Sequence, residues 1–168
     1  MADHTRTARR TRPTSVLEEI RQTKPFRSLA EHAMVTLLRT AEVVRWPFHD
    51  ALGPRGLTLQ QYNVLRILRG AGAGGLPTLD VAERMIERTP GVSRLIDRLV
   101  AKGLVRRERG DQDRRQVLCV ITDDGLALLR ELDRTITALD RRAFAGLSER
   151  EVRTLIALMD RVRHAAAP

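Results

Sequence analysis

The repeat of apolar residues in this chain changes from a helical period to a strand-like one, and then changes back. From Leu57 to Gly103 the apolar positions recur every three or four residues, which is the spacing of one helix face. Residues 104–108 and 116–121 instead have the short apolar pattern of strands, and the second is rich in β-branched residues. The helical spacing returns after Thr122. This order predicts several helices, one β-hairpin and then further helices.

Capping residues predict where four of the helices begin. Ser15, Thr58 and Ser148 each precede a Glu or Gln by three residues, an arrangement in which both side chains bond backbone N–H groups at a helix start. Thr122 stands where the helical period returns, so we expect it to cap the helix that follows the hairpin. The helix after Ser15 is expected to be short and to end near Gln22.

Two further caps are expected between Leu57 and Gly103. Thr78 precedes one apolar repeat, and Thr89 precedes another. Pro90 then falls at the first position of the helix that Thr89 caps, where its missing N–H does no harm. Gly103 follows this helix at the place where a left-handed residue commonly ends one.

A long helix is expected ahead of this segment, from about Pro25. We expect Pro47 to kink or end it, because proline lacks an N–H donor and its ring clashes with the preceding turn. The pair Gly53-Pro54 should close this part of the chain, and the glycine-rich run 70–75 should end the helix after it.

Together these elements predict a mainly α fold with a small β-hairpin wing, that is, a winged helix-turn-helix flanked by extra helices. We divide the chain into a basic arm with a short helix (1–24), a long N-terminal helix (25–56), the winged helix lobe (57–122) and two C-terminal helices (123–168). The flanking helices carry apolar faces too large to stay exposed. We therefore expect them to form a homodimer.

Charge and composition favour some partners and exclude others. The net charge of +9 favours a polyanionic partner, with a solvated arginine-rich surface as the alternative. The arginines of residues 1–13 form either a solvated tail or an arm that touches DNA phosphates. The lone Cys119 excludes an intrachain disulfide. No apolar run of about 18 residues is present to span a membrane, and no secretory signal is visible, so we expect a cytoplasmic protein.

The stretch from Leu57 to Gly125 resembles the MarR family of bacterial regulators. It reads LTLQQYNVLRIL, then VAERMIERTPGVSRLIDRLVAKGLVRRE, then DQDRRQVLCVITDDG, with the Thr-x-x-Gly that follows the family's wing at Thr122. The resemblance implies a homodimer, formed by residues 26–50 and 127–163, that binds double-stranded DNA. Because the two recognition helices of such a dimer are related by two-fold symmetry, its operator should be a palindrome.

The resemblance also assigns roles on the second helix of the motif. Residues at its exposed start are expected to contact bases: Thr89, Pro90, Gly91 and Arg94. Others are expected to bind the DNA backbone: Ser93, Arg98 and Lys102. We expect Arg94 to bind a guanine, with a phosphate contact as the alternative. An ion pair with Asp97 or Glu83 is the alternative for Arg98.

In the family, one arginine of the wing enters the minor groove and an Asp–Arg pair stiffens the hairpin. Here Asp113-Arg114-Arg115 carries that motif. We expect Arg114 or Arg115 in the groove, and Asp113 paired with the other arginine. The nearby side chains are expected to add charge that binds phosphates: Arg106, Arg107 and Arg109.

The sequence also bears on ligand binding and redox chemistry. Trp46, His49 and Tyr62 are expected to line a pocket for a small aromatic ligand that releases the DNA, with ordinary packing as the alternative. Cys119 is expected to be a buried, inert thiol rather than an oxidant sensor.

We expect neither a metal site, because the histidines lack ligand spacing, nor a cofactor, nor an enzyme, because no nucleophile elbow, phosphate loop or paired His and acid is visible. The competing functions are a ligand-independent or architectural DNA-binding protein and a winged helix that binds protein.

Overall fold

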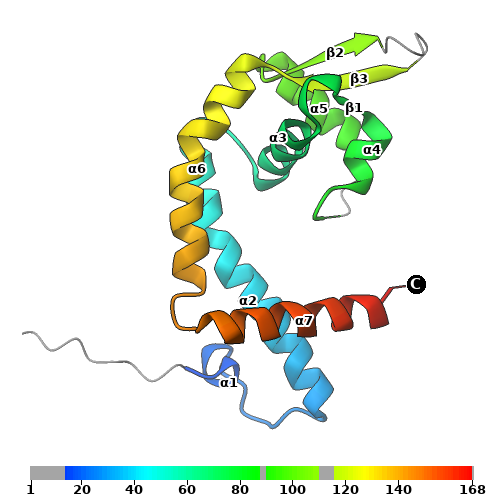
Figure 1. The fold of residues 1–168 in the computed structure, drawn as a ribbon. Helices are drawn as coiled ribbons and strands as arrows, with labels where there is room; N and C mark the ends of the chain where they lie inside the picture. Colours follow the sequence, from blue (N-terminus) through cyan, green and yellow to red (C-terminus); the bar gives the residue numbers. More distant parts are fainter. Residues whose placement is uncertain (1–13, 88–89, 110–115, 168) are drawn as a thin grey trace, which may run out of the picture. The chain divides into compact units, whose positions relative to one another are not determined.

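The computed structural model describes residues 14–87, 90–109 and 116–167. It is mainly helical with one small sheet, which confirms the predicted fold class (Figure 1). The chain falls into two compact units, residues 1–45 and 46–168. The four parts into which the sequence divides the chain have other boundaries than these two units. The roles given to the four parts stay predictions.

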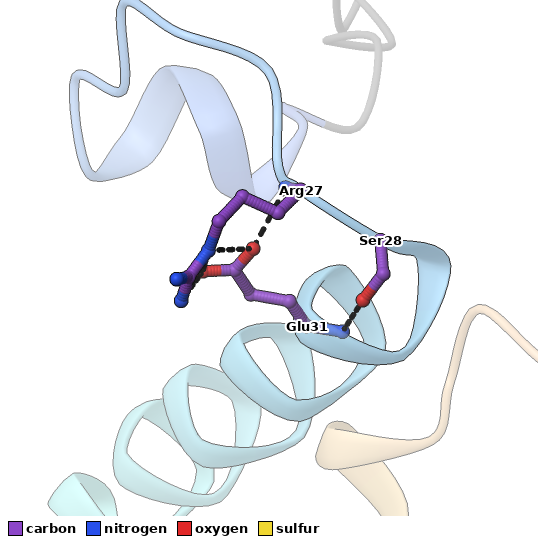
Figure 2. A network of polar contacts seen from close by, with 3 residues as sticks. All are labelled: Arg27, Ser28 and Glu31. Carbon is purple, nitrogen blue, oxygen red and sulfur yellow. Dashed lines mark hydrogen bonds and ion pairs between the residues drawn. The ribbon is translucent and has the colours of Figure 1, made fainter.

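The first unit begins with the short helix α1, Val16–Glu19, and Ser15 forms the predicted capping box with Glu18. The Glu19 carboxylate accepts a bond of 3.1 Å from Arg39. The long helix α2, Leu29–Leu52, starts four residues later than predicted. Figure 2 shows the reason: Ser28 accepts the backbone N–H of Glu31 at 3.1 Å, while the Glu31 carboxylate turns back to Arg27.

Pro47 lies inside α2 and does not end it, so that part of the prediction is wrong. The helix continues for five residues, to Leu52. Its last turns carry the half-buried Phe48 and the fully buried Leu52, which belong to the core of the second unit. Packing of these two side chains offsets the one backbone hydrogen bond that proline cannot donate. Gly53 then starts the 3-10 turn η1, Gly53–Arg55, as expected for the end of this segment.

Three helices and the sheet make the centre of the second unit. Helix α3, Leu59–Ala71, starts at the predicted Thr58–Gln61 capping box and ends at the glycine-rich turn η2, Gly72–Gly74. Helices α4, Thr78–Glu83, and α5, Val92–Ala101, follow. All three pack against the sheet, as Figure 1 shows. The fully buried core side chains come from these elements, from the end of α2 and from the helix over residues 123–143: Leu52, Val64, Leu65, Leu68, Val81, Ile96, Leu99, Cys119 and Leu129.

The sheet has three antiparallel strands in the order β1-β3-β2. Strands β2, Val105–Arg109, and β3, Val117–Ile121, are the predicted hairpin; β2 is shifted by one residue, and β3 starts one residue later than predicted but ends where predicted. Strand β1, Leu76–Pro77, was not predicted. The preceding Gly75 has φ +61°, and a Cβ there would lie 2.6 Å from the Cys119 carbonyl oxygen of β3. Glycine is therefore what lets the chain approach β3 closely enough to pair.

Two of the predicted caps are wrong. The Thr78 side chain does not cap α4; its hydroxyl lies 3.7 Å from the Cys119 sulfur, because residues 76 and 77 are pulled into the sheet. Helix α5 starts at Val92 with Gly91 as its N-cap residue, so Pro90 lies in the turn before the helix rather than at its first position. Thr89 lies outside the described residues.

The last two helices start at the predicted caps. Thr122 accepts the Gly125 N–H at 3.1 Å at the start of α6, Asp123–Ala143. Its hydroxyl also donates to the Gly103 carbonyl at 2.7 Å, which joins the end of α5 to the start of α6. Ser148 forms a capping box with Glu151 at the start of α7, Glu149–Ala165. Ion pairs fix α6 to earlier elements through Arg69–Asp133, 2.8 Å, and Arg55–Glu131, 2.7 Å.

Candidate nucleic-acid interface

Helix α5 has one buried face and one polar face. Val92, Ile96 and Leu99 are at most 7% exposed and face the core. The exposed polar residues recur one turn apart on the other side: Ser93, Arg94, Asp97 and Arg98. The side chains of Arg94 and Arg98 make no hydrogen bond or ion pair with any residue that the structure describes. Arg94 and Arg98 thus present two guanidinium groups, one turn apart, to a partner. The opposite face of the same helix is packed in the core.

The turn before α5 is held by polar side chains of α3. Asn63 accepts the backbone N–H of Ile86 at 2.9 Å, and Gln60 donates to the Glu87 carboxylate at 3.0 Å. Gly91 has φ +85°, a left-handed conformation that suits glycine and starts the helix. Sequence reasoning missed these α3 contacts, because an amide on a helix gives no sign of the distant backbone that it bonds.

Backbone hydrogen bonds also fix the end of α5. Gly103, with φ +72°, donates to Val100 at 2.9 Å, and Leu104 donates to Leu99 at 3.0 Å. These two bonds make the left-handed helix end that the sequence predicted. Lys102, a predicted DNA-backbone contact, donates to the carbonyl oxygen of Gly56. The structure therefore gives this ammonium group a partner within the protein.

The arginines of β2 alternate between two surroundings. Arg106 pairs with Glu108 and bonds the Ile121 carbonyl at 3.4 Å. Arg107 lies on the other side of the strand, where its guanidinium contacts the Asp97 carboxylate of α5 at 2.7 Å. The Arg109 side chain lies on the same side of β2 as that of Arg107 and makes no hydrogen bond or ion pair with another described residue. Asp97 thus pairs with Arg107, and not with Arg98 as the sequence had allowed.

Four predicted site residues lie outside the described part of the chain: Thr89, Asp113, Arg114 and Arg115. Their predicted roles stay predictions. The described residues Pro90, Gly91, Ser93, Arg94 and Arg98 lie together at α5 or in the turn before it.

The residues proposed from sequence to line a ligand pocket differ in burial. Tyr62 on α3 is 4% exposed, whereas Trp46 is 63% exposed and His49 is exposed as well. Burial raises the pKa of the Tyr62 phenol, and the guanidinium of Arg66 lies 5.9 Å from the centre of its ring. Cys119 is fully buried, as predicted for an inert thiol.

Among the described residues, no group of three or more His, Cys, Asp or Glu side chains is arranged to hold a metal ion. None of the helices that the structure describes has both the length and the apolar content needed to cross a membrane.

Comparison with known proteins finds relatives of one kind. Residues 55–116 match the model of the MarR family. The HTH-type transcriptional regulator PecS of Dickeya dadantii is 31% identical over 76% of this chain and 77% of its own. A MarR transcription factor structure from Planctomyces limnophilus is 37% identical, with a TM-score of 0.61 over 81% of this chain and 98% of that one. The structure of BpsR from Bordetella bronchiseptica is 26% identical, with a TM-score of 0.72 over 86% and 100%.

Proposed function

Because this chain belongs to the MarR family of DNA-binding transcriptional regulators, we propose that it is a homodimeric repressor that reads a palindromic operator. The observation that carries this proposal is the polar face of α5. Arg94 and Arg98 are exposed there, one turn apart, with no partner among the described residues. A single helix fits the DNA major groove, and arginine is the side chain that most often reads guanine in it. The protein would act in the cytoplasm, with the DNA.

The roles on α5 follow from its orientation. Base edges are read mainly from the start of a recognition helix, so Arg94 on the first turn is assigned to a guanine and Arg98 to a phosphate. Thr89, Pro90, Gly91 and Ser93 are next to this start in the sequence. They are assigned to nearby bases and phosphates.

The wing is assigned to the neighbouring minor groove. Arg114 or Arg115 would enter it, because the negative potential of a narrow minor groove attracts guanidinium groups. Asp113 would brace the other arginine. Arg109 would add a phosphate contact, because its side chain lies on the same side of β2 as that of Arg107, at the end of the strand. These contacts would raise affinity for any DNA sequence.

The homodimer is supported by large apolar side chains left exposed on the flanking elements. In the described chain they include Leu29, Met34 and Leu38 on α2, Phe144 and Leu147 between α6 and α7, and Ile156, Leu158 and Val162 on α7. Apolar surface of this extent favours burial against a partner. A two-fold dimer would present two copies of α5 about one DNA turn apart, hence to a palindrome.

We further propose that a small aromatic molecule controls DNA binding. Support comes from the similar protein BpsR, whose DNA binding is regulated by 6-hydroxynicotinic acid. Trp46, His49 and Tyr62 are the residues assigned to such a ligand here. A ligand that binds the DNA-incompetent conformation better shifts the population toward it and releases the operator.

Selection of DNA from a random library by the purified protein tests the repressor proposal. We expect one palindromic sequence to be enriched. Arg94→Ala should then weaken binding to it by about 1–3 kcal/mol and relax one base preference. Arg134→Ala, which removes an exposed arginine of α6, is the charge-matched control and should change little. Enrichment of DNA without any sequence preference would instead support an architectural protein, and no enrichment at moderate salt would contradict DNA reading by α5.

A further inference from the structure

The polar face of α5 carries one carboxylate. Asp97 is the only acidic residue between Pro90 and Gly103, and its side chain is 56% exposed. It follows Arg94 by three residues, so the two lie on neighbouring parts of one helix face. If this face lies against DNA, as proposed above, Asp97 brings a negative charge toward phosphates. Such a charge opposes binding unless something neutralises it.

Strand β2 supplies the neutralising group. The Arg107 guanidinium lies 2.7 Å from the Asp97 carboxylate and is itself 39% exposed. The backbone of β2 aims it there: Val105, two residues earlier, is 2% exposed and points into the core on the same side of the strand. Because β2 packs on α5, the third residue of the strand reaches across to the helix.

Folding stability does not explain why this pair exists. Ion pairs at comparable exposure contribute little to folding, because water screens them and ordering two side chains is costly. The same contact matters more when a polyanion approaches, because the field of an unpaired carboxylate then acts on every nearby phosphate. The consequence of this pair is therefore expected in DNA binding.

We propose that Arg107 is a positioning residue that masks the Asp97 carboxylate, and so allows α5 to lie against DNA, rather than a phosphate contact of its own. This rests on the proposed function. It changes the role that the sequence suggested for Arg107, since a guanidinium already engaged with a carboxylate has little net charge to offer a phosphate. Arg109, on the same side of β2 without a described acidic partner, keeps the role of phosphate contact.

The test measures binding of the full-length protein to the DNA selected by the wild type, over a range of salt concentrations. The wild type is compared first with Arg107→Ala, Asp97→Asn and the double variant. We expect Arg107→Ala to weaken binding roughly fivefold to tenfold, as one unmasked charge would. The double variant should regain most of the wild-type affinity, with an unchanged salt dependence. Arg107→Lys, which keeps a cation beside Asp97, should bind nearly as well as the wild type.

Arg109→Ala is the matched control, since it removes the same side chain from the same side of the same strand. The loss of DNA affinity in Arg109→Ala should persist when Asp97→Asn is added. The slope of log affinity against log salt should be less steep by about 0.9 in Arg109→Ala than in the wild type. Urea unfolding of each variant should give the wild-type midpoint, which excludes misfolding as the cause.

Two results would overturn the masking role. One is a double variant as weak as Arg107→Ala with a slope reduced like that of Arg109→Ala, which would make Arg107 a phosphate contact. The other is a loss of one base preference in Asp97→Asn alone, which would make Asp97 a base reader. Failure of the proposed function is separate, because it appears in the wild type as an absence of sequence-selective binding and removes the basis for masking as well.

Discussion

At the scale of single residues, Gly125 sets how closely α6 approaches the wing. A Cβ on Gly125 would lie 2.4 Å from the Leu104 carbonyl oxygen and 2.7 Å from an Ile121 side-chain carbon. The carbonyl belongs to backbone and cannot turn aside, so any larger residue must push the helix away. This explains physically why a glycine follows Thr122 by three residues.

Gly125→Ala should destabilise the fold by about 1–3 kcal/mol, the range found for overpacked sites. The urea midpoint, followed by circular dichroism, measures this loss. Gly70→Ala is the control, because Gly70 also lies in a helix but a Cβ there meets nothing within 4 Å. It should leave stability unchanged or raise it. Equal midpoints for the two variants would contradict the close contact.

Residue roles were the least predictable part of the site. The sequence located α5 and its exposed arginines, because helical spacing separates a buried face from a polar one. It could not show that Arg107 contacts Asp97, or that Lys102 bonds Gly56, because each contact joins two separate elements and depends on how they pack together. The sequence shows that a side chain carries a charge, but tertiary packing decides which group that charge contacts.

At the scale of elements, helix starts depend on local side chains and were mostly predictable. Ser15, Thr58, Thr122 and Ser148 cap helices as expected, because each cap bonds a backbone group only two or three residues away. Strand β1 was missed and the Thr78 cap was wrong for one common reason. Both are decided by pairing of residues 76 and 77 with β3, some forty residues later in the chain.

The start of α2 should respond to pH. The Glu31 carboxylate accepts the Arg27 guanidinium at 3.1 Å and its backbone N–H at 2.7 Å, and these bonds hold the pKa of Glu31 below its ordinary value of 4.5. Because the pKa is lowered in the folded state, this support is complete above 4.5 and is lost as the pH falls through the lowered pKa.

Arg27→Ala should therefore raise the pKa of Glu31 toward 4.5, since it removes the largest cause of the shift. An NMR titration of the side-chain carboxyl group measures the change. Arg39→Ala serves as the control, because Arg39 pairs with Glu19 and has no contact with Glu31 among the described residues. A pKa that stays in place in Arg27→Ala would show that the side-chain bond from Arg27 to Glu31 in Figure 2 does not persist in solution.

Thr122 holds two elements with one hydroxyl group, because it accepts from Gly125 and donates to Gly103. Thr122→Val keeps the shape but loses both bonds, and should lower the free energy of unfolding by about 1 kcal/mol, as loss of a helix cap does. Thr122→Ser keeps the hydroxyl and should stay near the wild type. Urea unfolding distinguishes them, and a fully stable Thr122→Val would refute the cap.

At the scale of the whole molecule, exposed apolar side chains on α7 support the proposed homodimer. Ile156 is 56% exposed and Val162 is 49% exposed on α7, near the end of the chain. Side chains of this kind gain free energy when water is excluded from them. The apolar pattern of α7 was readable in the sequence, but which of its faces stays uncovered required the structure.

Ile156→Glu should convert the proposed dimer to monomer, because a carboxylate without a partner is costly to bury in an apolar interface. Sedimentation equilibrium measures the mass, and affinity for the selected DNA should fall in parallel because two half-sites can no longer be bound together. Thr154→Glu places the same charge on an exposed polar position of the same helix and should remain dimeric. A dimeric Ile156→Glu would exclude this part of α7 from the interface.

The contact of Gly125 with Leu104 also decides where the protein can be cut and recombined. The end of β3 is the obvious junction for joining the DNA-reading lobe to another dimerising scaffold. A chimera joined there would bring a foreign side chain against the Leu104 carbonyl and lose the hydroxyl that bonds Gly103. The transferable module therefore extends through the first turn of α6, and a chimera has to include Thr122 and Gly125.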